Sequence, residues 1–132
     1  MEEYGAQITS ISLERGACFG SCPIYKVTLN SDGTATYDGE RFVERIGEYQ
    51  AQIDLYDYSR LAGFVERAGF LEWDDEYVKE NITDLPNYYL TVVADGETKT
   101  VHQYGVDEPP DFWVIASLVD FLADRADWTS IV

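Results

Sequence analysis

The residues from Cys18 to Tyr25 (CFGSCPIY) are the first place in the sequence where side-chain types and spacing could support chemistry. Two cysteines separated by three residues can form a disulfide, act in thiol–disulfide exchange, or supply two thiolates to a metal ion. Gly20 and Pro23 favour a bend between them, which brings the two sulfur atoms within reach of each other. The segment therefore predicts a bend at which Cys18 and Cys22 approach.

A structural role for the two cysteines fits the neighbouring residues better than catalysis does. A thiolate catalyst needs a helix N-terminus or a nearby cation, whereas a strand-like segment follows Cys22 and only Arg15 and Lys26 are close in sequence. The spacing also differs from that of two-residue redox motifs. A closed zinc site would need two more soft ligands, and the chain offers only His102. We expect a structural pair, as a disulfide or as buried thiols, ahead of redox function and metal binding, and no cofactor.

His102 is the single histidine and the one side chain whose ordinary pKa lies near neutrality. Pairing with a cysteine would make a nucleophile. However, strand alternation places His102 with Thr100 and Tyr104 on the face opposite Val101. We therefore expect a surface histidine rather than a catalytic one.

The segment from Trp73 to Pro86 is acidic and lacks any hydrophobic period, so it is predicted to be a long loop. Its carboxylates do not have the alternating oxygen spacing or the central glycine of a calcium-binding loop. A solvated loop is the expected reading, and no metal site is predicted.

Charge excludes two classes of partner. The chain has 9 Lys and Arg against 25 Asp and Glu, a formal net charge of −16. Such a field repels phosphate backbones and anionic headgroups, so we expect no nucleic-acid binding.

No apolar stretch is long enough to span a bilayer, which predicts no membrane insertion. The acidic N-terminus does not resemble a signal peptide, so the sequence as written predicts a cytoplasmic protein, with export as the alternative if a leader was removed.

The hydrophobic pattern predicts an α+β fold in which residues 1–132 form a single domain. Expected strands and helices lie in the order four strands, helix, two strands, helix, with hairpin-length links between consecutive strands. We predict a twisted antiparallel sheet of about six strands with both helices packed on one face. The strands are expected at 7–14, 24–29, 34–37, 41–49, 88–93 and 98–104, and the helices at 53–69 and 112–126.

The two halves of the chain, about residues 23–73 and 87–128, share a pattern. Each has a strand, an Asp-Gly turn, a return strand and a closing helix. Leu61-Ala-Gly-Phe64 aligns with Leu118-Val-Asp-Phe121. A weak internal duplication and convergence on common turn chemistry both explain this pattern.

The segment around the cysteines, the Asp32-Gly33 turn and the later Thr83-Asp-Leu-Pro86 together resemble a bacterial family catalogued only as a domain of unknown function. The family signatures are C-F-G-x-C-P-x-Y and T-D-L-P, and the resemblance covers roughly residues 8 to 125. Many members are exported or lipid-anchored. The resemblance implies a shared fold and two marked segments, but no reaction.

If the two signature segments meet in space, one candidate binding cluster results. Its members are Cys18, Cys22, Tyr25, Thr83, Asp84, His102 and Tyr104. Because catalytic motifs such as a phosphate loop or a nucleophile elbow are missing, we expect a non-enzymatic module that binds a protein or a small molecule. The alternative is a thiol-dependent redox or hydrolytic enzyme centred on Cys18 and Cys22.

Overall fold

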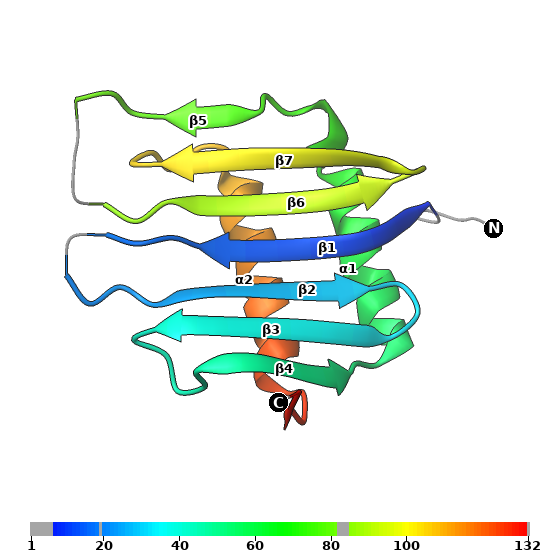
Figure 1. Cartoon of the computed structure of the whole chain (residues 1–132). Helices are drawn as coiled ribbons and strands as arrows, with labels where there is room; N and C mark the ends of the chain where they lie inside the picture. Colours follow the sequence, from blue (N-terminus) through cyan, green and yellow to red (C-terminus); the bar gives the residue numbers. More distant parts are fainter. Residues whose placement is uncertain (1–6, 19, 82–84, 132) are drawn as a thin grey trace.

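The computed structural model describes residues 7–18, 20–81 and 85–131. These residues form a mixed α+β structure with two α-helices and an open sheet of eight strands (Figure 1). The elements in chain order are β1 (Ile8–Arg15), β2 (Ile24–Asn30), β3 (Thr34–Arg41), β4 (Gly47–Gln52), α1 (Leu55–Arg67), the 3-10 helix η1 (Phe70–Glu72), β5 (Glu76–Val78), β6 (Tyr88–Ala94), β7 (Glu97–Tyr104), α2 (Pro110–Asp124) and β8 (Thr129–Ser130).

Strand β1 lies near the middle of the sheet, whose order is β5-β7-β6-β1-β2-β3-β4-β8. The predicted antiparallel meander of the first four strands is confirmed, and β6 pairs antiparallel with the other edge of β1. The expected number of about six strands was wrong. The two additional strands, β5 and β8, are three and two residues long, which is too short to show an alternating pattern. One of them, β5, lies in the segment predicted to be a loop and pairs parallel with β7.

The turn between β6 and β7 has the residues that a two-residue hairpin requires. Asp95 and Gly96 both adopt positive φ, at 55° and 80°. A type I′ turn needs this conformation at both central positions, and Asp-Gly tolerates it at low cost. The Asp-Gly signal therefore placed this hairpin correctly.

Both helices cover the same face of the sheet (Figure 1). Asp54 caps α1, because its carboxylate accepts a hydrogen bond from the amide of Asp57 at 3.0 Å. The predicted helices at 53–69 and 112–126 are present with slightly different ends. Within the described residues, neither helix is long and apolar enough to cross a membrane.

Alternate residues of the strands bury their side chains beneath the helices. On β1, Ile11 and Leu13 have no exposed surface, and neither do Val27 and Leu29 of β2. The helices contribute Phe112, Ile115, Leu61 and Val65, among others, to the same core. Burial of large apolar side chains is the main favourable term in folding, so this layer holds the two helices on the sheet.

The opposite face of the sheet is polar. Its central row crosses five strands, with Thr36, Thr28, Ser12, Thr91 and Thr100 as successive cross-strand partners. Several of these hydroxyls bond to one another, as Ser12 does to Thr28 at 3.0 Å. Polar side chains with high strand propensity suit a face that no helix covers.

Close approach at Gly39 of β3 generates a first prediction. A Cβ atom at Gly39 would overlap the carbonyl oxygen of Arg45 and lie 2.8 Å from the hydroxyl of Tyr37. We expect Gly39→Ala to lower the free energy of unfolding by about 2 kcal/mol, because the backbone must shift to admit the methyl group. Urea denaturation measures the change. The control is Gly16→Ala, where the nearest atom is an ordinary 3.4 Å away; equal midpoints for the two variants would contradict the prediction.

Candidate functional site

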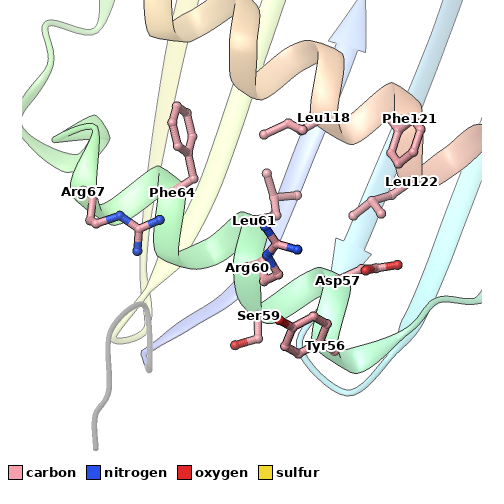
Figure 2. A pocket seen from close by; sticks show the side chains of 10 residues that line it. All are labelled: Tyr56, Asp57, Ser59, Arg60, Leu61, Phe64, Arg67, Leu118, Phe121 and Leu122. Carbon is pink, nitrogen blue, oxygen red and sulfur yellow. The ribbon is translucent and has the colours of Figure 1, made fainter.

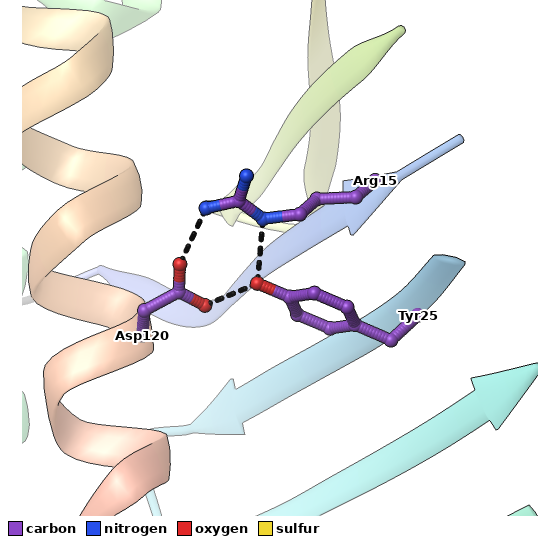
Figure 3. Close-up of polar contacts among 3 residues, drawn as sticks. All are labelled: Arg15, Tyr25 and Asp120. Atoms are coloured by element: carbon purple, nitrogen blue, oxygen red, sulfur yellow. Dashed lines mark hydrogen bonds and ion pairs between the residues drawn. The ribbon is translucent and has the colours of Figure 1, made fainter. Parts of the chain in front are cut away.

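Arg15, Tyr25 and Asp120 form a closed triangle of hydrogen bonds between the sheet and α2 (Figure 3). The Nε–H of Arg15 donates to the Tyr25 hydroxyl at 2.6 Å, and this hydroxyl donates to Oδ1 of Asp120 at 2.6 Å. Arg15 also donates from Nη2 to Oδ2 of Asp120 at 2.7 Å. The arginine and aspartate side chains are each 26% exposed, so this is a half-buried ion pair.

Strand pairing and alternation bring these three residues together. Arg15 ends β1 and lies opposite Tyr25 on β2. Arg15 is on the same face of β1 as the buried Ile11 and Leu13, because side chains alternate along a strand. It therefore points towards α2, where it meets Asp120. The guanidinium carbon also lies 5.6 Å from the ring centroid of Tyr25 and 5.1 Å from that of Tyr88, within the range of cation–π contacts.

The electrostatics of the triangle keep Tyr25 and Arg15 protonated. Burial raises the pKa of the Tyr25 hydroxyl well above that of free tyrosine, and the hydrogen bond to Asp120 raises it further. Burial alone would lower the pKa of Arg15, but the hydrogen bond to Asp120 and the charges of its neighbours raise it overall. A tyrosine held protonated is a poor general base or nucleophile at neutral pH. The triangle is therefore suited to joining α2 to the sheet rather than to catalysis.

Cys18 and Cys22 lie in the connection between β1 and β2, between the two strand residues of this triangle. Their sulfur atoms are 1.97 Å apart and their Cα atoms 5.8 Å apart, the separations of a disulfide. The predicted approach of the two cysteines at the bend is therefore found. The disulfide cross-links two residues of the connection that runs from Arg15 to Tyr25.

Not all of the residues named in the sequence-based cluster come together. Tyr25 points towards α2, whereas His102 and Tyr104 lie on the opposite, polar face of the sheet. The strand register shows this, because Tyr25 and Gln103 lie in the same row across the sheet and therefore face the same side. His102 and Tyr104 are next to Gln103 in β7, so alternation turns both to the other side. The structure thus separates His102 and Tyr104 from the disulfide-linked connection and Tyr25. Thr83 and Asp84 lie outside the described residues.

His102 has partners of its own on the polar face. Its Nε2 lies 2.6 Å from Oδ1 of Asn87, and its ring stacks on that of Tyr89 with 4.6 Å between centroids. Glu76 approaches Nδ1 at 3.8 Å. The hydroxyl of the neighbouring Tyr104 accepts a hydrogen bond from the amide of Leu85 at 3.4 Å. In the part of the chain that the structure describes, no group of three or more His, Cys, Asp or Glu side chains is arranged to hold a metal ion.

A groove of about 490 Å³ runs between α1 and α2 on the outer side of the helical layer (Figure 2). The residues that line it are Tyr56, Asp57, Ser59, Arg60, Leu61, Phe64, Arg67, Leu118, Phe121 and Leu122. Two aromatic side chains are unusually open to solvent there, since Tyr56 is 68% and Phe121 54% exposed. We call this feature the α1–α2 groove.

The groove is lined by side chains that border the buried side of each helix. On α1 the side chains that point into the core include Tyr58, Leu61, Ala62 and Val65, and the side chains next to them on the helix surface remain accessible to solvent. Phe64 of α1 and Phe121 of α2 both line the groove, and each ends one of the two segments that align in the sequence. The sequence shows both as aromatic residues of the expected helices, but a helical pattern alone does not show which neighbouring element each side of a helix will face.

The triangle generates a prediction about stability. Asp120→Asn leaves the half-buried charge of Arg15 without its carboxylate and weakens the bond from Tyr25. We expect it to lower the free energy of unfolding by about 2 kcal/mol, because an unpaired buried charge keeps its desolvation cost. Chemical denaturation provides the measurement. The control is Asp124→Asn, an exposed position one turn further along α2; a loss as large there would show that any carboxylate on this helix matters equally.

A second prediction concerns alkaline pH. Burial raises the pKa of Tyr25 and of Tyr58 in the folded protein above the ordinary value of 10.0. The unfolded chain therefore loses these protons first, so the stability they contribute is present below about pH 10 and is lost as the pH rises further. We expect the free energy of unfolding to fall as the pH rises above about 10, the ordinary tyrosine pKa, and Tyr25→Phe to reduce that slope. An identical slope in Tyr25→Phe would contradict this assignment.

Comparison with protein families places the chain in one of them. The family model "Domain of unknown function (DUF6438)" matches residues 9–123, which includes every element from β1 to α2 apart from a few terminal residues. No curated protein matches the chain. Because the match covers most of the sequence, this protein belongs to the DUF6438 family, whose function is unknown.

Proposed function

We propose that this domain is a non-enzymatic binding module, and that its binding surface for a partner protein is the α1–α2 groove. The observation that carries the proposal is the pair of solvent-exposed aromatic side chains, Tyr56 at 68% and Phe121 at 54% exposed, on the walls of a groove of about 490 Å³. Contiguous exposed apolar surface of this kind marks interaction sites more often than it occurs by chance.

The groove has the form that suits a protein segment. Its volume lies within the range of ligand sites, but two helices bound it as parallel ridges and leave it open along its length. Phe64 and Leu118, both partly exposed, line the same groove and continue its apolar surface along the helices beyond Phe121. Laying the apolar side of a helix into such a groove is a common mode of peptide recognition.

Other surfaces of the domain are less suited to this task. The edge strands β5 and β8 are three and two residues long, and short edges offer few backbone groups for an added strand. On the polar face, hydroxyls such as those of Thr91 and Thr100 already bond to each other at 3.0 Å. Both cysteines of the chain are paired, so a hydrolytic enzyme that uses a thiol would lack a free nucleophile in this state.

Selection from a random peptide library displayed on phage, against the immobilised domain, tests the proposal. Enriched peptides are expected to lose at least about tenfold in affinity for a Phe121→Ser variant, because truncating a central aromatic anchor commonly costs that much. The matched control is Val114→Ser, since Val114 is 42% exposed on the same helix but does not line the groove. Enrichment of peptides that bind both variants as tightly as the parent would place the binding surface elsewhere and overturn the proposal.

A further inference from the structure

We propose that the segment recognised by the α1–α2 groove is an amphipathic helix of a partner protein whose apolar stripe is flanked by carboxylates. This inference rests on the proposed binding function and names the chemistry of the partner. The observation behind it is that a chain with 25 acidic and 9 basic residues places two of its arginines, Arg60 and Arg67, in a groove that also exposes aromatic rings.

The two arginines lie on one wall of the groove, among apolar and aromatic side chains of the same helix, whereas the other wall is apolar. Arg60 and Arg67 both belong to α1, whereas Leu118, Phe121 and Leu122 belong to α2 (Figure 2). The arginines are seven residues apart, which corresponds to two helical turns, or about 10 Å along α1. The groove therefore combines an α1 wall that carries both arginines and apolar side chains such as Phe64 with an α2 wall that is apolar.

Two arginines and a single carboxylate are among the residues that line the groove. Asp57 is the one carboxylate among the lining residues, and it already lies 3.8 Å from Arg125, which extends from the end of α2. Arg60 and Arg67 are exposed, and the guanidinium of Arg60 lies 5.6 Å from the ring centroid of Tyr56. Ligand carboxylates can reach exposed guanidinium groups without burying an unpaired charge.

The net charge of −16 does not prevent recognition of an acidic segment. At physiological ionic strength, charges separated by more than about 8 Å in water are largely screened. The contacting arginines act within hydrogen-bond distance. Exposed acidic residues of the helices, such as Glu66 and Asp124, are not among the lining residues, and those on the polar face of the sheet lie on the far side of the core. Local charge therefore decides which segment fits the groove, and the overall field disfavours acidic segments everywhere else on the surface.

The length of the walls sets the form of the ligand. α1 has 13 residues, which corresponds to about 20 Å. A partner helix of similar length can lay an i, i+3/i+4, i+7 apolar stripe against Phe64, Leu118 and Phe121, as helix-in-groove ligands do. Carboxylates about seven residues apart on one flank of that helix would then lie opposite Arg60 and Arg67.

Three synthetic helical peptides test the inference. All share one leucine stripe, and their flanking positions carry Glu, Gln or Lys at the seven-residue spacing. Fluorescence anisotropy with the whole domain measures each affinity. We expect the Glu peptide to bind about tenfold more tightly than the Lys peptide, since two exposed charge pairs each contribute a few-fold. The variant Arg60→Glu/Arg67→Glu is expected to reverse this order.

A charge-matched variant distinguishes the groove from the overall field. Arg41→Glu/Lys79→Glu changes the net charge by the same amount at exposed positions outside the groove, and it should keep the parent's order of affinities. Circular dichroism checks that each variant is folded. Reversal by this variant, or equal affinities for the three peptides, would overturn the carboxylate inference.

The outcomes also separate this inference from the proposed function. Three peptides that bind with equal affinity, and all bind more weakly to Phe121→Ser, would leave the groove as a binding site but remove its preference for carboxylates. If none of the three binds at a concentration of about 1 mM, where even weak recognition is detectable, the inference fails for helical segments, and the library selection then decides the proposed function by itself.

Discussion

One-sided burial of the sheet is the constraint on which the other features of this structure depend. Two helices cover one face, and the side chains beneath them, such as Ile11 and Leu13 of the central strand β1, have no exposed surface. Since nothing in the described structure covers the other face, that face must be polar, and it carries a row of hydroxyls. The outer side of the helical layer is one place where apolar side chains are exposed outside the core, as Phe121 is in the α1–α2 groove.

The half-buried triangle adds specificity to that apolar layer. Burial of leucines and valines alone would allow α2 to slide or rotate on the sheet, because hydrophobic contact is not directional. The three hydrogen bonds among Arg15, Tyr25 and Asp120 have fixed geometry and join one turn of α2 to two neighbouring strands. The disulfide between Cys18 and Cys22 cross-links the connection between those two strands. The most characteristic sequence segment thus positions α2, and through α2 one wall of the α1–α2 groove.

Local patterns in the sequence determined much of the fold. The helical periods predicted both helices to within a few residues of their ends, and the Asp95-Gly96 dipeptide predicted a hairpin turn that the φ angles bear out. Cys18 and Cys22 were predicted to approach because only a short bend separates them. The resemblance to a family without an assigned function was confirmed by the family model. In each case the information lies within about ten to twenty residues, where backbone preference and hydrophobic period act directly.

Only the tertiary structure decided which distant residues meet. The partners Arg15 and Asp120 are 105 residues apart in sequence, and no local pattern around either residue predicts that the two will meet. The register of the strands, which depends on β6 pairing beside β1, placed His102 on the opposite face from Tyr25 and so divided the expected cluster. The groove arose because α1 and α2 pack side by side with Phe121 on the flank. The sequence by itself therefore determined the helices and strands, the turns and the overall charge. Long-range packing of both helices against one face of the sheet decided where the triangle and the α1–α2 groove form.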